Sequence, residues 1–520
     1  MKILLVAPQS AIFPVGIAYI SASLKHAGHD VDCCIFDKPD DLIERLWQKY
    51  DFVATGGLSS QFIQLKHITD IGKKTNTKLI VGGGIITSEP ELMSRALNGD
   101  YEVMGEGEET IIELLSCLEN NGDLSRIDGI GYFEHGKFIL NGRRKPIENL
   151  DSLPWPDYDG FEFHRMLDSM KPTDMYYYDV FDYPREYPII TSRSCPFLCT
   201  FCYHPLGNKY RQRSVDSIMQ ELETAIPKYR INIVAIHDEL FSYNEKRVYE
   251  FCRRFREFTD TLPWEVKWFC QMRVDRLKDS MLDTMRESGC FLISYGFESY
   301  SPTVLRSMKK HIYSEQIHRA VHATLDRGIA IQANFIFGDK AETLQTAQET
   351  LDFWKDHLEA GIALFFIFAC PNSEMYQYCI KKGIIKDKLD FIANHLFDVL
   401  NMTAMSDADF FKLRTTVAKY ISKYSVQSVP LKRTLTSVTT RCPYCKEIIE
   451  YGNLITKRVF YIRQVSCRNC RKRYFIVSRL YRLYTKSFAL MVTPLTYRIY
   501  VALKKVRSVV RNLSTSEDGH

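Results

Sequence analysis

The sequence predicts an α/β protein with two parallel-sheet domains in series and a small cysteine-rich module after them. Three observations point to this fold class. Short apolar runs alternate with helical patterns over the first 120 residues, longer units of the same kind resume near residue 187, and two Cys-x-x-Cys pairs follow at 442–470. With 520 residues, 45% of them hydrophobic and 25% charged, the chain has the composition of a soluble globular protein of two or three domains.

Residues 1–125 are predicted to form a doubly wound domain of the flavodoxin or Rossmann type. Five short apolar runs bounded by glycine or polar residues are typical of buried parallel strands: KILLVAP, DVDCCIFD, FVATGGL, KLIVGGG and YEVMGEG. Four segments between them have the apolar spacing of helices: 15–28, 40–50, 62–74 and 90–99. Ligands of such sheets bind at the carboxyl ends of the strands, so the glycine-rich strand ends are the expected binding edge.

Residues 126–185 are predicted to be a hairpin and a linker. GIGYFEHGKFILNGRR, residues 129–144, is typical of a hairpin that closes over a His-Gly turn. PIENLDSLPWPDYDGF, which follows, is rich in proline and acidic residues and is typical of an extended linker.

Residues 186–400 are predicted to form a partial (βα)6 barrel, followed by a helical extension over 401–440. The six strand candidates are YPIITSR, INIVAIHD, WEVKWFCQMR, FLISYGFE, IAIQANFIFG and ALFFIFA. Most of them precede a long helical pattern, such as SVDSIMQELETAIPKYR after the first. Functional residues of such barrels lie just past the carboxyl ends of the strands.

The loop after the first of these strands, TSRSCPFLCTFCYHP, holds three cysteines within eight residues. Thiolates are the ligands of iron-sulfur clusters, and a [4Fe-4S] cube normally takes four of them. Three cysteines would leave one iron open to a substrate or cofactor. A zinc site or three packed thiols is the alternative interpretation.

Cys195, Cys199 and Cys202, with the aromatic Phe201 before the last, resemble the CxxxCxΦC motif of the radical S-adenosylmethionine (SAM) superfamily. In that family the open iron is chelated by the amino and carboxylate groups of SAM. The resemblance implies SAM-binding residues on the loop and past the later strands: Phe201, Asp238, Glu239, Arg273, Glu298 and Gly338. IFGDKAET resembles the family's G-x-P-G-E-T turn but carries Lys340 and Ala341 for Pro-Gly. For each carboxylate, a solvated loop charge is the alternative.

The N-terminal domain resembles the cobalamin-binding domain that precedes the barrel in one branch of this superfamily. The matching segments are 14–31, 55–60, 81–84 and 103–110. Glycines at strand ends let a cofactor approach the backbone closely. The positions expected to contact cobalamin are Ser59, Gly82, Gly83, Gly84, Gly105, Glu106 and Gly107. No Asp-x-His-x-x-Gly occurs in residues 1–130, so no histidine is placed by that motif to ligate cobalt. A domain of purely structural role is the alternative.

Residues 441–475 are predicted to form a zinc-ribbon-like module. Cys442 and Cys445 form one Cys-x-x-Cys pair, and Cys467 and Cys470 form the other. Two such knuckles bring four thiolates together as a structural zinc site does. A second iron-sulfur cluster is the alternative.

Residues 476–520 form a basic tail with many aromatic residues. Of the 68 Lys and Arg and 63 Asp and Glu of the chain, residues 471–520 hold 11 and 2. Peripheral contact with an anionic membrane, an acidic partner and a plain solvated tail remain open, and no nucleic acid is expected as a partner. MKILLVAPQS shows no signal peptide, so the sequence predicts a cytoplasmic protein, with membrane association left open.

The resemblance implies an enzyme that cleaves SAM reductively and removes hydrogen from an unactivated carbon. Cobalamin-dependent C-methylation is the function it favours. Radical cyclisation, rearrangement or oxidation without methyl transfer is one alternative, and a cluster-containing binding or redox-sensing protein is another. The expected partners are a small-molecule or lipid-linked substrate and an electron donor such as flavodoxin or ferredoxin. No catalytic side chain is assigned.

Overall fold

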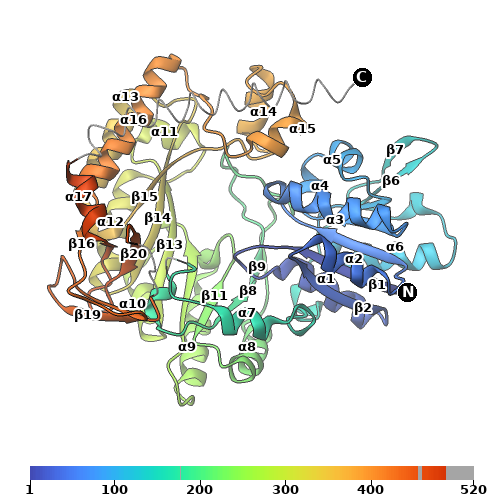
Figure 1. The fold of residues 1–520 in the computed structure, drawn as a ribbon, viewed down its shortest axis with the longest axis horizontal. Coiled ribbons are helices and arrows are strands. Elements are labelled where there is room, and N and C mark those ends of the chain that lie inside the picture. Colours follow the sequence, from blue (N-terminus) through green and yellow to red (C-terminus); the bar gives the residue numbers. More distant parts are fainter. Residues whose placement is uncertain (176, 455–458, 488–520) are drawn as a thin grey trace.

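The computed structural model describes residues 1–175, 177–454 and 459–487, which form a mixed sheet and a parallel sheet with their helices and a small ribbon module (Figure 1). Of the predicted basic tail, residues 476–487 are described and include α17 (Arg479–Ser487), whereas residues 488–520 lie outside the described residues. Within the described part of the chain, no helix is long and apolar enough to cross a membrane.

The first sheet has seven strands in the order β2-β1-β3-β4-β5-β6-β7. The parallel strands are β1 (Lys2–Pro8), β2 (Asp30–Phe36), β3 (Phe52–Gly56), β4 (Lys78–Gly82) and β5 (Tyr101–Val103). The hairpin of β6 (Ile130–Glu134) and β7 (Lys137–Leu140) extends this sheet, because β6 pairs antiparallel with β5. The hairpin covers an edge that β5 would otherwise leave open.

Helices cover both faces of this sheet. Alternate residues of β1 enter different cores: Ile3 and Leu5 pack with residues of α1 and α6, and Leu4 and Val6 pack with residues of α2 and α3. The helices are α1 (Val15–His26), α2 (Pro39–Leu46), α3 (Phe62–Lys74), α4 (Gly84–Ser88), α5 (Pro90–Leu97) and α6 (Gly107–Glu119). The strands are therefore apolar on both sides, as the sequence predicts for a doubly wound sheet.

The segment predicted as an extended linker is packed between the two sheets. It contains short turns and α7 (Phe163–Ser169). Tyr158 stacks on Phe13 of the first domain, with ring centroids 4.9 Å apart, and Phe163 meets Tyr229 of the barrel at 5.2 Å. Proline and acidic residues indicated an extended backbone, but the aromatic rings between them bury that backbone against both domains.

The second sheet has six parallel strands in the order β15-β14-β13-β12-β11-β8. The strands are β8 (Glu186–Ile189), β11 (Ile233–Ile236), β12 (Lys267–Met272), β13 (Cys290–Glu298), β14 (Ala330–Phe337) and β15 (Ala363–Phe366). The helices are α8 (Val215–Tyr229), α9 (Glu245–Thr259), α10 (Asp279–Glu287), α11 (Pro302–Ser307), α12 (Ser314–Asp326) and α13 (Leu344–Asp356). Between β8 and β15 the sheet does not close, which makes it the predicted partial barrel.

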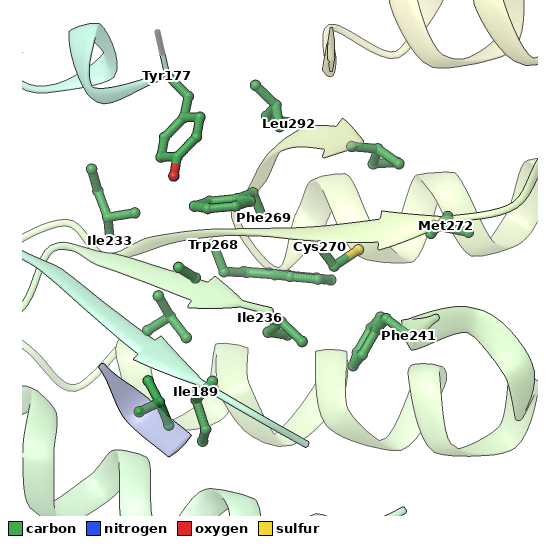
Figure 2. Packing of buried hydrophobic residues seen from close by; sticks show 14 of the residues in the cluster. Tyr177, Ile189, Ile233, Ile236, Phe241, Trp268, Phe269, Cys270, Met272 and Leu292 are labelled. Atoms are coloured by element: carbon green, nitrogen blue, oxygen red, sulfur yellow. The ribbon is translucent and has the colours of Figure 1, made fainter. Parts of the chain in front are cut away.

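Successive residues of β12 face opposite sides of this sheet (Figure 2). Trp268 packs against Phe251 of α9, with ring centroids 5.2 Å apart. Phe269 points the other way and meets Tyr177 at 4.5 Å. The segment before β8 therefore fills one end of the barrel.

The chain after β15 reaches back over the first domain. Tyr376 of α14 (Glu374–Lys381) shares an apolar cluster with Ile85 and Met93 of the first domain. Lys388, at the start of α15 (Lys388–Asp390), forms an ion pair with Glu89, 2.9 Å apart. These contacts hold the two sheets together on a second side.

The C-terminal module is built from two hairpins. They follow α16 (Asp407–Tyr424), β16 (Gln427–Ser428) and β17 (Lys432–Arg433), and consist of β18 (Ser437–Arg441), β19 (Ile448–Gly452), β20 (Ile462–Ser466) and β21 (Arg473–Val477). The module docks on the segment before β8: the backbone N–H of Ser466 donates to Asp179 over 2.9 Å, and that of Gly452 donates to Asp182 over 2.8 Å. It therefore lies at the amino ends of the barrel strands.

Candidate functional site

The three-cysteine loop leaves the carboxyl end of β8 and is closed by a short antiparallel ribbon. β9 (Ser192–Arg193) and β10 (Arg211–Gln212) pair at its base, on the side of the barrel that faces the first sheet (Figure 1). The N–H of Thr200 donates to the carbonyl of Met308 over 3.0 Å, and the carbonyl of Thr200 accepts from Met375 over 3.0 Å. Backbone from two other barrel units therefore clamps the middle of the loop.

The three thiols differ in exposure and in acidity. Cys199 is buried, Cys195 is half-buried and Cys202 is exposed. The pKa of Cys199 is lowered to about 6, chiefly by its hydrogen bond with Cys202 and then by the positive charges of Lys310 and Arg273, against the effect of burial. The same hydrogen bond raises the pKa of Cys202. The loop thus favours one thiolate, the ligand form of cysteine, before any metal binds.

Among the described residues, these thiols do not form a group whose ligand atoms all lie within 4.8 Å of one another, whereas the four thiols of the C-terminal module do. A single ion draws its ligands together. A cube of four irons holds its thiolates at separate corners, which stand further apart. The spacing of Cys195, Cys199 and Cys202 fits a cluster better than one zinc ion.

Asp238 fastens the start of the loop. Its carboxylate accepts hydrogen bonds from the backbone and hydroxyl of Thr191, over 2.6 and 2.5 Å, and of Ser192, over 2.9 and 2.7 Å. The carboxylate is fully buried and these four bonds occupy both oxygens. A positioning role therefore fits Asp238 better than the predicted contact with SAM.

Glu298 forms a buried ion pair with a residue that the sequence analysis did not single out. Its Oε1 lies 2.8 Å from Nζ of Lys310, which also lies 5.9 Å from the ring centroid of Phe201. The Glu298 backbone has a φ of 63°, a conformation unusual for glutamate, beside a bulge in β13. A lone lysine in a loop carries no periodic signal, so only the folded chain brings Lys310 beside the cysteine loop.

Arg273 joins the cysteine loop to the segment before α12. Its guanidinium lies over the ring of Phe197, 3.6 Å from the centroid, and donates to the carbonyls of Lys310 and His311 over 2.8 and 3.2 Å. Both phenylalanines of the loop thus have a cation beside the ring, from Arg273 and Lys310.

Glu239 and Gly338 have different surroundings. Glu239 is exposed and lies 3.6 Å from Nδ1 of His204, whose pKa it raises. Gly338 has a φ of 105° and donates its N–H to Glu342 over 3.4 Å, which shapes the turn between β14 and α13. The side chain of Glu239 is therefore accessible to a ligand, whereas Gly338 fixes the backbone of the turn after β14.

A cavity of about 730 Å³ lies between the carboxyl ends of β1, β3, β4 and β5 and the base of the cysteine loop. The predicted cobalamin residues that line it are Gly82, Gly83, Gly84, Gly105, Glu106 and Gly107. The predicted Ser59 is not among the lining residues, but its neighbours Ser60 and Gln61 are. From the barrel side, the cavity is lined by residues that include Arg193, His237 and Glu239.

Glycine is required at two points of this cavity. A Cβ on Gly83 would lie 2.6 Å from the nitrogen of Gly57, so the loops after β3 and β4 touch backbone to backbone. Gly105 has a φ of 71° and nothing within 4 Å of the position of a Cβ. The cavity wall there is bare backbone, which a large flat cofactor can approach closely.

Within the described lining of this cavity, the first domain contributes no histidine, and His237 at the end of β11 is the histidine present. The first domain contributes the amides of Gln9, Gln61 and Gln64.

A buried ion cluster links the cavity to the cysteine loop. Arg193 lies 2.8 Å from Glu106 and 2.6 Å from Glu108, and Arg211 lies 2.7 Å from Glu106. All four side chains are at most 8% exposed. Glu106 thus holds the β9–β10 ribbon while it lines the cavity, and the two arginines are functional candidates that sequence reasoning missed.

The four cysteines of the C-terminal module come together at the tips of its two hairpins. Sγ of Cys442 and Cys470 are 3.8 Å apart, and Sγ of Cys445 and Cys467 are 3.6 Å apart. Tetrahedral zinc with Zn–S bonds of about 2.3 Å places its sulfurs roughly 3.8 Å apart. The donor set therefore fits one zinc ion.

Two family models match the chain. The model of the radical SAM superfamily matches residues 189–353, and the model of the B12 binding domain matches residues 1–115. An uncharacterised methyltransferase of Pyrococcus horikoshii is 30% identical over 482 residues, which cover 88% of this chain and 97% of that protein. Cytidylyl-2-hydroxyethylphosphonate methyltransferase of Streptomyces wedmorensis is 23% identical, over 74% of this chain and 82% of that one.

Two solved structures share the fold. The radical SAM methyltransferase TsrM from Kitasatospora setae superposes with a TM-score of 0.61 at 16% identity, over 73% of this chain and 77% of that one. The cobalamin-dependent radical enzyme OxsB superposes with a TM-score of 0.58 at 18% identity, over 78% of this chain and 58% of that one.

Proposed function

The chain belongs to the radical SAM superfamily, in the branch with an N-terminal B12-binding domain, and on this premise we propose that it is a cobalamin-dependent methyltransferase acting on carbon. The observation that carries the proposal is the cavity. It is lined by the glycine-rich strand ends of the first domain and by the base of the cysteine loop, so a cofactor held by one faces a cofactor held by the other.

Cys195, Cys199 and Cys202 would hold a [4Fe-4S] cluster, with SAM at the open iron. The glycine loops at residues 82–84 and 105–107 would hold cobalamin. Bound in these places, the cluster supplies the electron that cleaves SAM, and cobalamin supplies a methyl group.

The protein's own residues position these groups and exclude water from them. Lys310 and Arg273 place positive charge beside the cysteine loop, which favours thiolates at the metal. Glu239 is exposed beside the loop, where a polar substrate or the amino group of SAM can reach it, and His204 lies behind it, 3.6 Å from its carboxylate. Asp238 and the pair Arg193 and Arg211 hold the loop still, and a fixed geometry lowers the entropy cost of bringing reactants together.

The substrate is a small molecule, and the electron comes from a reduced donor of the flavodoxin or ferredoxin type. We assign a structural zinc ion to Cys442, Cys445, Cys467 and Cys470. Their sulfur spacing and their position at the amino ends of the barrel strands, away from the cysteine loop, support a structural role.

The test uses anaerobically reconstituted protein with SAM, methylcobalamin and a strong reductant. Cys199→Ala should lose the visible absorbance of the cluster and all 5′-deoxyadenosine formation, whereas the matched variant Cys117→Ala should keep both, because Cys117 lies on α6 away from the loop. With substrate, the wild type should form S-adenosylhomocysteine as well as 5′-deoxyadenosine.

Two other outcomes would assign a different function. Deoxyadenosine without S-adenosylhomocysteine would assign radical chemistry without methyl transfer. A reconstituted cluster that never cleaves SAM would assign a binding or sensing role and contradict the proposal.

A further inference from the structure

Three histidines from two neighbouring helices meet on the outside of the barrel. His318 and His322 lie one turn apart on α12, and His357 directly follows α13. One ring nitrogen from each lies within 4.8 Å of the other two. The ring centroids of His318 and His322 are 4.4 Å apart, and each lies 5.4 Å from that of His357.

His357 is held in one orientation and one tautomer. Its Nδ1 lies 2.8 Å from the carbonyl oxygen of Phe353, and because a carbonyl only accepts, Nδ1 carries the proton and Nε2 keeps its lone pair. Its ring stacks on Phe353, with centroids 4.0 Å apart, and Phe353 stacks on Tyr300 at 4.0 Å. A backbone carbonyl on the second nitrogen is the usual partner of a metal-binding histidine.

The other two histidines can adjust to a metal. Both are exposed, and the i, i+4 spacing puts them on one face of α12, as in helical zinc motifs. Zinc with Zn–N bonds of about 2.0–2.1 Å holds imidazole nitrogens roughly 3.4 Å apart. Rotation of the two exposed side chains can close the remaining distance.

Ordinary surface packing is the competing explanation, and the convergence of three ring nitrogens, with Nδ1 of His357 held by a backbone carbonyl, argues against it. Within the described residues, none of the three histidines forms an ion pair with Asp or Glu, although His204, His237 and His395 each do. Three nitrogen ligands face one another with no acidic partner.

We propose that His318, His322 and His357 form a zinc site with three imidazole ligands and an open fourth position. Among the described residues no fourth protein ligand joins the group, so a water completes it. The site is separate from the four-cysteine module in position and in ligand chemistry. Zinc there ties α12 to the end of α13, and the turn just before α12 is the one that carries Met308 and Lys310 against the cysteine loop.

The experiment measures zinc by metal analysis after equilibrium dialysis of the full-length protein against a series of free zinc concentrations. His318→Ala and His322→Ala alter exposed positions on a helix and should leave the far-ultraviolet circular dichroism unchanged. Each should bind one zinc fewer per chain than the wild type. The matched control His164→Ala, also exposed, should bind as the wild type does.

A second measurement separates this site from the cysteines. In the background of Cys467→Ser with Cys470→Ser, which removes one Cys-x-x-Cys pair of the module, added zinc should still raise the Tm, and His322→Ala should abolish that rise. Equal zinc content in the wild type and both histidine variants at every free zinc concentration would overturn the proposal. So would a zinc-dependent rise in Tm that survives His322→Ala in this background.

Discussion

Gly296 is a glycine because of the ion pair beside it. A Cβ at this position would lie 2.3 Å from Oε1 of Glu298 and 2.6 Å from Nζ of Lys310. Both charged side chains are only 10% exposed, so neither can move into water without opening the end of β13. The Tyr-Gly-Phe-Glu-Ser segment thus supplies the glutamate of a buried ion pair together with the space that the pair needs.

Gly296→Ala should therefore displace this pair and destabilise the protein by about 1–3 kcal/mol, since the added methyl group overpacks a buried site. Denaturant unfolding of the protein measures the loss. Gly16→Ala is the matched control: a Cβ there meets nothing within 4 Å, and the change should alter the free energy of unfolding by less than about 1 kcal/mol. Equal unfolding free energies for the two variants would contradict this account of Gly296.

Glu342 makes stability depend on pH. Burial raises its pKa from 4.5 to about 7, although Thr346 and the N–H of Gly338 donate to it. Between these two values the folded protein holds a proton that the unfolded chain has lost. The contribution of Glu342 to the free energy of unfolding is therefore greatest below pH 4.5 and falls as the pH rises to about 7.

Glu342→Gln should remove this part of the pH dependence, because an amide does not titrate. The measurement is the Tm at pH 5 and at pH 8. The decrease in Tm from pH 5 to pH 8 should be smaller in the variant than in the wild type. An unchanged decrease would show that Glu342 is not the titrating group.

At the scale of elements, the loop after β5 and the β9–β10 ribbon behave as one unit. Glu106 and Glu108 come from the start of α6, and Arg193 and Arg211 come from the two strands of the ribbon. The guanidinium of Arg193 also lies 5.1 Å from the ring centroid of Tyr19 on α1. Any shift of the cavity wall at Glu106 is therefore passed to the base of the cysteine loop.

Arg193→Met should leave Glu108 buried without its partner and destabilise the protein by about 3–5 kcal/mol. Iron content after reconstitution should fall as well, because the base of the cysteine loop loses its ion pairs with Glu106 and Glu108. The double variant Arg193→Met with Glu108→Gln should recover part of both losses. Arg165→Met, whose side chain is 71% exposed, is the control and should change neither. An Arg193→Met protein with normal stability and iron content would refute the coupling.

At the scale of the whole molecule, the three-cysteine loop and the four-cysteine module lie at opposite ends of the barrel strands. The cysteine loop follows β8, and the four-cysteine module rests on the segment that precedes β8. Asp179, which receives the N–H of Ser466, is so buried that its pKa is raised to about 6. The module therefore stabilises the fold from the end away from the reaction.

Cys470→Ser should lower zinc content and Tm without abolishing SAM cleavage. A structural zinc site adds directly to folding stability. For a domain of about 150–250 residues, such as the barrel on which the module rests, Tm falls by roughly 2–4 °C for each kcal/mol lost. The assay is 5′-deoxyadenosine formation at a temperature below the new Tm. Loss of SAM cleavage in a folded Cys470→Ser protein would give the module a role in the reaction.

The positions of the strands along the chain could be predicted because they depend on local patterns. The five strands of the first domain and the six of the barrel are marked by apolar runs and glycine-bounded ends, and each forms near its predicted place. The linker was harder, because its prolines and acids hide the aromatic rings of Tyr158 and Phe163 that pack it between the sheets.

By itself, the sequence determined the two sheets, the three-cysteine loop, the glycine edge and the four-cysteine module, because strand periodicity and ligand spacing are properties of neighbouring residues. Only the tertiary structure decided which charges meet. Lys310 lies beside Glu298, Arg193 lies between Glu106 and Glu108, and His357 lies beside His318 and His322, because long-range packing brings them together. The same long-range packing brings Thr191 and Ser192 to the carboxylate of Asp238, whose contact with SAM stays a prediction.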